Sequence, residues 1–124
     1  MKLCITSQGG DIAASVDPRF GRAAFFVVID TDTMQYEIFE NMSIQASGGA
    51  GISAAKAVID SGAKAVLTGD CGPNAFRTLQ AANIAVYTGV SGSVQQAVDA
   101  FKQGDMKPVS QASVDSHNGM SPQG

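Results

Sequence analysis

Residues 65–72 read AVLTGDCG, and residues 85–92 repeat the pattern as AVYTGVSG, with the same Ala, Val, Thr and two Gly at matching offsets. Each copy begins as a short apolar strand and passes through two glycines into a helical pattern. The repeat is short, so chance or the common chemistry of β–α turns explains it as well as duplication does. In either case, the pattern predicts two strand–loop–helix units whose loops lie side by side.

Both units continue into a predicted helix. Residues 73–82 place Phe76 and Leu79 on one face, and Ser93 with Gln96 has the form of a capping box at the start of the last helix. The apolar residues of that last helix recur at i, i+3, i+4 and i+7, namely Val94, Ala97, Val98 and Phe101. These spacings are typical of helices with one buried face.

Upstream, the sequence predicts three strands and a first helix. Residues 1–7 and 34–40 alternate in side-chain character, and residues 23–29 form a continuous apolar run typical of a central strand. The run and the strand after it are expected to form an antiparallel hairpin, with residues 34–40 nearer the sheet edge. A glycine-rich loop then leads into a helix that ends at Gly62. The expected inward face of this helix carries Ile52, Ala55 and Ile59.

The predicted order is β-β-β-α-β-α-β-α, which indicates an α/β fold with a mixed five-stranded sheet and helices on both faces. Right-handed crossovers make the last two strands parallel to the third, and the first strand fits beside the fourth. Ligands bind open α/β sheets at the carboxyl edge of the strands. We therefore expect a site where the loops that leave the first, third, fourth and fifth strands meet, including the long loop from the first strand that enters the second.

The composition fits one domain. With 124 residues, of which 44% are hydrophobic and 15% charged, the chain can bury one core. We expect a domain at residues 1–104 and, where the apolar pattern stops, a flexible tail at residues 105–124. The first residues do not resemble a secretory signal, no segment is long enough to span a membrane, and a reducing cytosol would keep the two cysteines as thiols. We therefore expect a cytoplasmic protein without membrane contact.

The charge pattern favours an anionic small ligand over nucleic acid. A net charge of -3 argues against nonspecific nucleic-acid binding, which needs many basic side chains. Arg19 and Arg22 supply local positive charge in the loop that enters the second strand, although two solvated surface arginines explain the sequence equally well. Glycines at the starts of the predicted helices add backbone N–H donors and helix dipoles. These candidate glycines are Gly48, Gly49, Gly51, Gly69, Gly72 and Gly92.

Sulfur-containing residues offer candidate metal ligands. Cys71 precedes a predicted helix N-terminus, where a thiol ionises more readily, so it is either a metal ligand or a small buried residue of the turn. Met42 offers a thioether to a soft metal, with packing as the alternative. Cys4 lies within the first strand and is expected in the core. His117, the only histidine, lies in the predicted tail and is expected to be solvated, with a lid ligand that folds back over the site as the alternative.

Two other functions remain open. The strand order also occurs in ribonuclease H, whose two-metal site needs clustered carboxylates, whereas here the first strand offers Cys4 and Thr6. Asp11, Asp17 and Asp70 are the acids expected to approach the ligand edge, which is weak support for a nuclease. The second alternative is a regulatory or assembly module that binds a partner protein through its hairpin edge. The sequence suggests no Ser-His-Asp or Cys-His pairing, which argues against a hydrolase.

Three stretches resemble a known family. They are DPRFGR at residues 17–22 followed by FFVVID at 25–30, GAGISAA at 49–55, and AVLTGDCG at 65–72. Together they resemble the dinitrogenase iron-molybdenum cofactor biosynthesis family over about residues 1–103. The Phe-Gly-Arg element at residues 20–22 and the glycine-rich β–α turns carry the resemblance.

The resemblance implies a ribonuclease H-like fold without nuclease activity. It also implies non-catalytic binding, storage or delivery of an anionic molybdenum-containing metal-sulfur cluster, with a protein partner that receives it. The cluster would be a molybdenum-copper sulfide or a related molybdenum- or iron-sulfur cluster. Phe20 and Gly21 join the candidate binding residues through this resemblance, together with Arg19, Arg22 and Cys71.

Overall fold

The computed structural model describes residues 1–42 and 49–112. The strands are β1 (Lys2–Ser7), β2 (Phe25–Asp30), β3 (Tyr36–Glu40), β4 (Ala65–Leu67) and β5 (Ala85–Tyr87). The helices are α1 (Ala50–Ser61), α2 (Pro73–Ala81) and α3 (Val94–Lys102). The predicted order of elements is confirmed. β3 begins later than predicted because Met34, with a φ of 64°, belongs to the turn of the hairpin.

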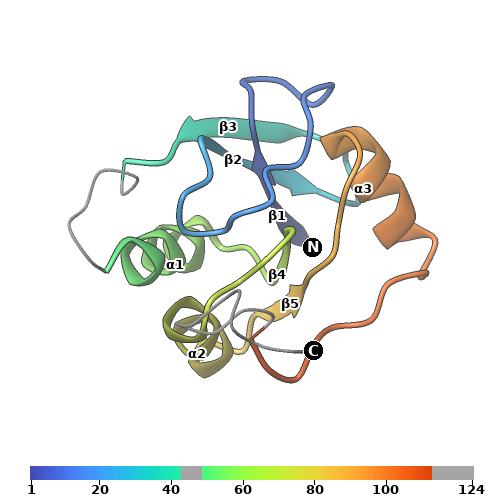
Figure 1. Ribbon diagram of the computed structural model, residues 1–124. Coiled ribbons are helices and arrows are strands. Elements are labelled where there is room, and N and C mark those ends of the chain that lie inside the picture. The colour runs from blue at the N-terminus through green and yellow to red at the C-terminus, as the bar shows by residue number, and fades with distance from the viewer. Residues whose placement is uncertain (43–48, 113–124) are drawn as a thin grey trace.

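The sheet has the strand order β3-β2-β1-β4-β5 (Figure 1). β2 is antiparallel to both of its neighbours, whereas β1, β4 and β5 are mutually parallel. The structure thus confirms the mixed five-stranded sheet, the place of β1 beside β4 and the edge position of β3. The carboxyl ends of β1, β3, β4 and β5 lie at one edge of the sheet, which is where the candidate site was expected.

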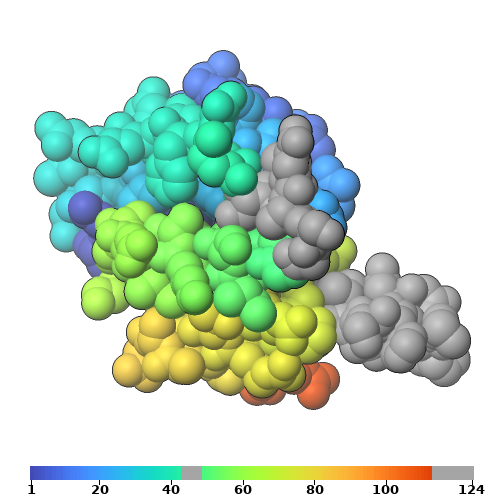
Figure 2. Space-filling model, turned by 90° about the vertical axis from the view of Figure 1, so that its left-hand side faces the viewer, coloured from blue at the N-terminus to red at the C-terminus, as the bar shows by residue number. Residues whose placement is uncertain are grey.

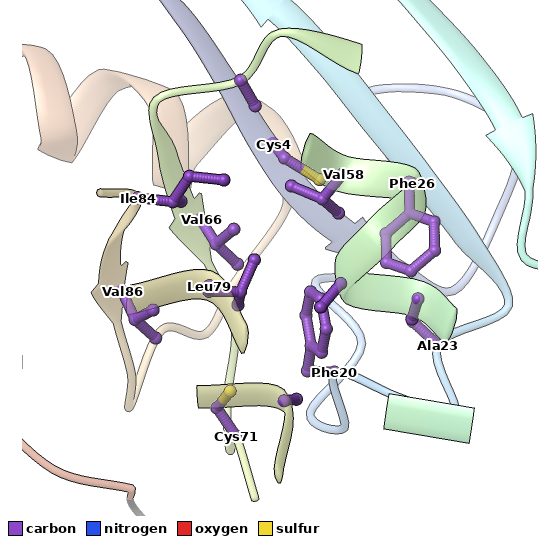
Figure 3. Close-up of a cluster of buried hydrophobic side chains, with 14 of the residues drawn as sticks. Cys4, Phe20, Ala23, Phe26, Val58, Val66, Cys71, Leu79, Ile84 and Val86 are labelled. Atoms are coloured by element: carbon purple, nitrogen blue, oxygen red, sulfur yellow. The ribbon is translucent and has the colours of Figure 1, made fainter. Parts of the chain in front are cut away.

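Helices cover both faces of the sheet, as predicted. One apolar cluster joins α1 and α2 to the sheet face that carries Cys4 and Phe26 (Figure 3). A second cluster joins α3 to the opposite face, which carries Leu3 and Ile5. The alternation of side chains along β1 produces this division, because successive residues of a strand point to opposite faces. Figure 2 shows the β2–β3 hairpin, α1 and α2 as three adjacent bands on one side of the molecule.

The buried face of α1 only partly matches the predicted one, with Ala55 buried and Ile59 packed against the first apolar cluster as expected. Ala54, Ala55 and Val58 are fully buried, whereas Ile52 and Ile59 are only partly buried. The sequence reading gave weight to the large isoleucines. The helix instead turns its alanines inward, which lets its backbone approach the sheet and α2 closely.

Residues 105–112, expected to begin a flexible tail, pack along β5. The Val109 N–H donates to the Val86 carbonyl at 2.8 Å, and Val109 and Ala112 pack against the first apolar cluster. Met106 packs against the second cluster. This segment therefore covers the outer edge of β5. The rest of the predicted tail, with His117, lies outside the described residues.

No helix in the described ranges combines the length and the apolar character needed to cross a bilayer.

Candidate anion-binding site

The loops after β4 and β5 lie side by side, as the sequence repeat predicted. The Gly89 N–H donates to the Gly69 carbonyl at 2.8 Å, and the Val90 N–H donates to the Thr68 carbonyl at 3.1 Å. These hydrogen bonds extend the pairing of β4 and β5 beyond the last strand residues. The two turns therefore form one continuous rim at the carboxyl edge.

The N-terminus of α3 does not add free donors to this rim, although the start of the last predicted helix, at Gly92, was expected to supply them. The Val94 and Gln95 N–H groups donate to the carbonyls of Ala14 and Ile12 at 2.9 and 3.0 Å. The predicted capping box is confirmed, and Ser93 and Gln96 use it to satisfy each other's N–H groups. The first-turn donors of α3 are therefore already engaged.

The position of α3 at the end of the described fold explains why its N-terminus lies elsewhere. No strand follows α3 in the described chain, so the crossover rule does not fix its side, and the helix covers the face that α1 and α2 leave open. Gly92, a predicted site residue, belongs to the α3 cap. Its φ is 87°, and a Cβ there would lie 2.6 Å from Oε1 of Gln96.

The two helices whose N-terminal ends lie together are α1 and α2. A Cβ built on Gly51 would lie 3.2 Å from the Cβ of Ala75, which places the first turns of the two helices in contact. Gly49, with a φ of 70°, and Gly72 occupy the N-cap positions, and neither cap uses a side chain. A Cβ at Gly49 or Gly72 would meet nothing within 4 Å, so the space beside both caps is open among the described residues.

Backbone N–H groups at these two helix starts are candidate donors. The first-turn N–H groups of an α-helix have no partner within the helix. Among the described residues, no backbone carbonyl outside the helices accepts a hydrogen bond from the N–H of Ile52 or of Ala75. The positive ends of both helix dipoles therefore meet at one place, which favours an anion.

The loop that carries the arginines lies against the same place. The Asp70 N–H donates to the Pro18 carbonyl at 2.7 Å, and the Phe20 N–H donates to the Asp70 carbonyl at 3.0 Å. This pair of bonds forms a short parallel bridge between Arg19 and Asp70, directly before Cys71. Gly69 permits the approach, since a Cβ there would lie 2.6 Å from Pro18. The predicted proximity of Arg19 to the β4–α2 turn is confirmed.

Gly21 and Met42 complete the candidate site. A Cβ on Gly21 would come within 2.9 Å of the Gly51 Cα, so the arginine loop contacts the start of α1. The Asn41 side-chain amide donates to the Gly21 and Ala23 carbonyls at 3.0 and 2.9 Å, which holds the chain before Met42 against this loop. Met42 is 85% exposed, and Arg22 is exposed beside Gly21.

Phe20 and Cys71, both predicted binding residues, have buried side chains. The Phe20 side chain is buried, and its ring centroid lies 5.7 Å from that of Phe26 (Figure 3). Cys71 is also buried in the first apolar cluster, and desolvation raises its thiol pKa to about 12. Sequence reasoning placed the thiol at a helix N-terminus, where it would ionise easily, but its burial dominates. Cys4 lies in the core, as predicted.

Sequence reasoning considered Asp17 only as a possible nuclease acid and missed its place beneath Arg19. Its buried carboxylate accepts hydrogen bonds from the Arg19 and Ala24 N–H groups at 3.1 and 3.2 Å. The Nε of Arg19 lies 3.7 Å from the same carboxylate. The available signal in the sequence was an acidic residue directly before a Pro-Arg pair, Asp17 before Pro18 and Arg19.

The donor set of the site suits an anion held by hydrogen bonds and charge. The described residues contain no group of three or more His, Cys, Asp or Glu side chains placed to hold a metal ion. The site offers backbone N–H groups, two guanidinium groups and one exposed thioether. The predicted binding residues Arg19, Gly21, Arg22, Met42, Gly49, Gly51, Gly69 and Gly72 lie in the contacting loops and helix starts described above, and Gly48 lies outside the described residues.

Comparisons with known proteins agree on one family. The family model described as dinitrogenase iron-molybdenum cofactor matches residues 1–104. The structure of the apo form of the orange protein from Desulfovibrio gigas superposes with a TM-score of 0.87 at 43% identity, over 90% of this chain and 94% of that chain. No curated protein matches the chain.

Two further solved structures are similar. A Thermotoga protein described as a candidate NifB protein gives a TM-score of 0.76 at 34% identity, covering 86% of this chain and 91% of its own. A candidate dinitrogenase from Methanocaldococcus jannaschii shares the fold, with a TM-score of 0.66 at 16% identity, covering 90% of this chain and 96% of its own. With the family model matching most of its length, this chain belongs to the dinitrogenase iron-molybdenum cofactor family.

Proposed function

We propose that this protein binds an anionic molybdenum-containing metal-sulfur cluster and carries it as cargo to a protein partner, without catalysing a reaction on it. The cluster is a molybdenum-copper sulfide or a related molybdenum- or iron-sulfur cluster. The observation that carries the proposal is the contact between the first turns of α1 and α2, at Gly51 and Ala75, beside the loop of Arg19 and Arg22.

The chemistry of the site matches such a cargo. A thiometallate presents sulfide atoms that carry negative charge and accept hydrogen bonds. Backbone N–H groups at two helix starts supply donors whose positions are fixed before binding, so little ordering accompanies capture. Two guanidinium groups add charge-assisted hydrogen bonds. Local positive charge of this kind lets a chain with a net charge of -3 retain an anion.

The proposal assigns no metal bond to Cys71, because its thiol is buried and stays protonated. Met42 is the exposed sulfur next to the site and would contact the cluster surface. Holding the cluster without direct ligation suits a carrier, because release then breaks no metal–protein bond. We place the carrier in the cytoplasm, where a reducing medium keeps Cys4 and Cys71 as thiols.

The comparisons support this proposal at the level of the family. The matching family model names an iron-molybdenum cofactor, and the orange protein structure at 43% identity is described as an apo form. We also take the fold to be ribonuclease H-like, since the order β3-β2-β1-β4-β5 with an antiparallel β2 matches that arrangement. The role proposed for the site is binding alone.

Reconstitution with tetrathiomolybdate, with and without copper, tests the proposal. Wild-type protein should acquire a visible absorption band and retain molybdenum through gel filtration. The double variant Arg19→Gln/Arg22→Gln should bind at least about tenfold more weakly, because two charge-assisted contacts are lost. The double variant Lys102→Gln/Lys107→Gln makes the same change in net charge on exposed residues of the α3 and β5 side. Equal binding by both double variants would refute the proposed site.

A further inference from the structure

A buried carboxylate organises the arginine loop. Oδ1 of Asp17 accepts a hydrogen bond from the Arg19 N–H at 3.1 Å, and Oδ2 accepts one from the Ala24 N–H at 3.2 Å. The two donors lie on either side of residues 20–23, the last part of the loop that precedes β2. One side chain therefore bridges this turn.

The main chain at Asp17 is anchored to the sheet. The Asp17 N–H donates to the Thr6 carbonyl at 2.9 Å, and the Thr6 hydroxyl donates to the Asp17 carbonyl at 2.7 Å. The same hydroxyl lies 2.9 Å from the hydroxyl of Thr68, which precedes the β4–α2 turn. Thr6 and Thr68 are fully buried. The backbone of Asp17 is thus anchored to β1 and, through the Thr6 hydroxyl, to Thr68 directly after β4.

Burial of this carboxylate makes its pairing with Arg19 significant. The Asp17 side chain is 4% exposed, and a buried charge is costly unless it is paired. The Arg19 side chain is 64% exposed, and its Nε lies 3.7 Å from Oδ1 of Asp17. A guanidinium group that turns its Nε toward one carboxylate keeps its terminal nitrogens for another acceptor.

We infer that Asp17 is a positioning residue for the anion site, which holds the Arg19 guanidinium by its inner edge and directs its terminal nitrogens toward the cluster. The inference rests on the proposed function. Asp17 does not touch the cluster and acts through Arg19. Groups that orient a ligand-contacting side chain in this way commonly change affinity tenfold or more when they are replaced.

A double-mutant cycle on tetrathiomolybdate affinity tests the inference. Asp17→Asn should weaken binding roughly tenfold in the wild-type background and have almost no effect in the Arg19→Gln background. Arg19→Lys keeps the positive charge and the buried acid but loses the planar Nε contact, so it should weaken binding about as much as Asp17→Asn. Because Arg19 is largely exposed, this variant folds even where Asp17→Asn does not.

Asp11→Asn is the matched control. Asp11 is an exposed carboxylate of the same long loop that accepts a hydrogen bond from the Ala13 N–H at 2.7 Å, and its replacement makes the same change in charge. The affinity of the Asp11→Asn variant for tetrathiomolybdate should stay at the wild-type value. If Arg19→Lys keeps the wild-type affinity, or if Asp17→Asn has an equal effect in both backgrounds, the role of Asp17 is overturned. The proposed function is not affected by either result. Failure of the wild-type protein to bind tetrathiomolybdate overturns the proposed function, and the role of Asp17 with it.

Discussion

Gly21 and Gly51 meet backbone against backbone, so closely that a Cβ on Gly21 would lie 2.9 Å from the Gly51 Cα and 3.1 Å from its nitrogen. The contact joins a loop that follows β1 to the first turn of α1. It brings the loop that carries both arginines against a helix N-terminus. The geometry of the site therefore depends on the absence of a side chain at position 21.

Gly21→Ala should lower both stability and cluster affinity. The added methyl group meets backbone atoms, which cannot rotate away, so the loop must shift at a cost of about 1–3 kcal/mol. Urea unfolding measures the loss of stability, and tetrathiomolybdate titration measures the loss of affinity. Gly10→Ala is the control, since a Cβ there makes only an ordinary contact with the Phe25 ring at 3.9 Å. Equal stability of the two variants would contradict the close contact.

Ser93→Ala should destabilise the fold without weakening cluster binding. The Ser93 hydroxyl caps α3 by accepting from the Gln96 N–H at 3.0 Å, and loss of such a cap costs about 1 kcal/mol. The α3 N-terminus faces the carbonyls of Ala14 and Ile12 instead of the site. Urea unfolding and tetrathiomolybdate titration on one preparation separate the two effects. If fully folded Ser93→Ala protein lost affinity for tetrathiomolybdate, α3 would contribute to the site.

The sheet could be predicted from the sequence because local patterns determine it. The repeat at residues 65–72 and 85–92 predicts two parallel strands with adjacent turns, and the apolar run of β2 predicts a central antiparallel strand. Handedness of the crossovers then leaves few arrangements. The contact between Arg19 and the β4–α2 turn followed from the same reasoning, since both loops leave the sheet at one edge.

The parts that sequence reasoning missed depend on packing. The local sequence does not determine on which face of the sheet α3 packs. It therefore did not predict that the N-terminal ends of α1 and α2 lie together. The helix-terminal position of Cys71 suggested an ionised thiol, but the ionisation of a thiol depends on the atoms around it. Gly51 and Ala75 mark the true helix pair, and their small size is visible in the sequence only once the contact is known.

Stability should depend on Asp30 at acid pH. The Asp32 N–H, 2.8 Å from Oδ1, lowers the pKa of Asp30 first of all, with help from the Thr33 N–H and the N-terminal ammonium. A carboxylate with a lowered pKa stabilises the fold above its unfolded pKa, and this stabilisation is lost as the pH falls through the folded value. Asp30→Asn should therefore be less stable than wild type at pH 6 and equally stable well below pH 4, as measured by urea unfolding. An equal difference at both pH values would contradict this assignment.

Both thiols should resist modification in the folded protein. Burial raises the pKa of Cys4 and of Cys71, and the thiolate is the reactive form. An aromatic disulfide reagent at pH 8 should react with neither thiol until urea unfolds the chain. Because the folded state keeps these protons longer than the unfolded state, stability should also fall as the pH rises above about 9. Rapid reaction of one thiol in native protein would show that the β4–α2 turn or β1 opens.

Cys71→Ala should retain the cluster, although the thiol lies directly after Asp70 at the site. Its side chain packs with the apolar residues beneath the turn, so the expected cost is a stability loss of about 1 kcal/mol from the small cavity. Molybdenum content per folded protein, measured by elemental analysis after gel filtration, should match that of the wild type. The matched variant is Cys4→Ala, which removes the other buried thiol within β1 and should also leave the molybdenum content unchanged. Loss of molybdenum in Cys71→Ala alone would mean that the thiol leaves the core and ligates the cluster, and that capture by backbone donors and arginines is insufficient.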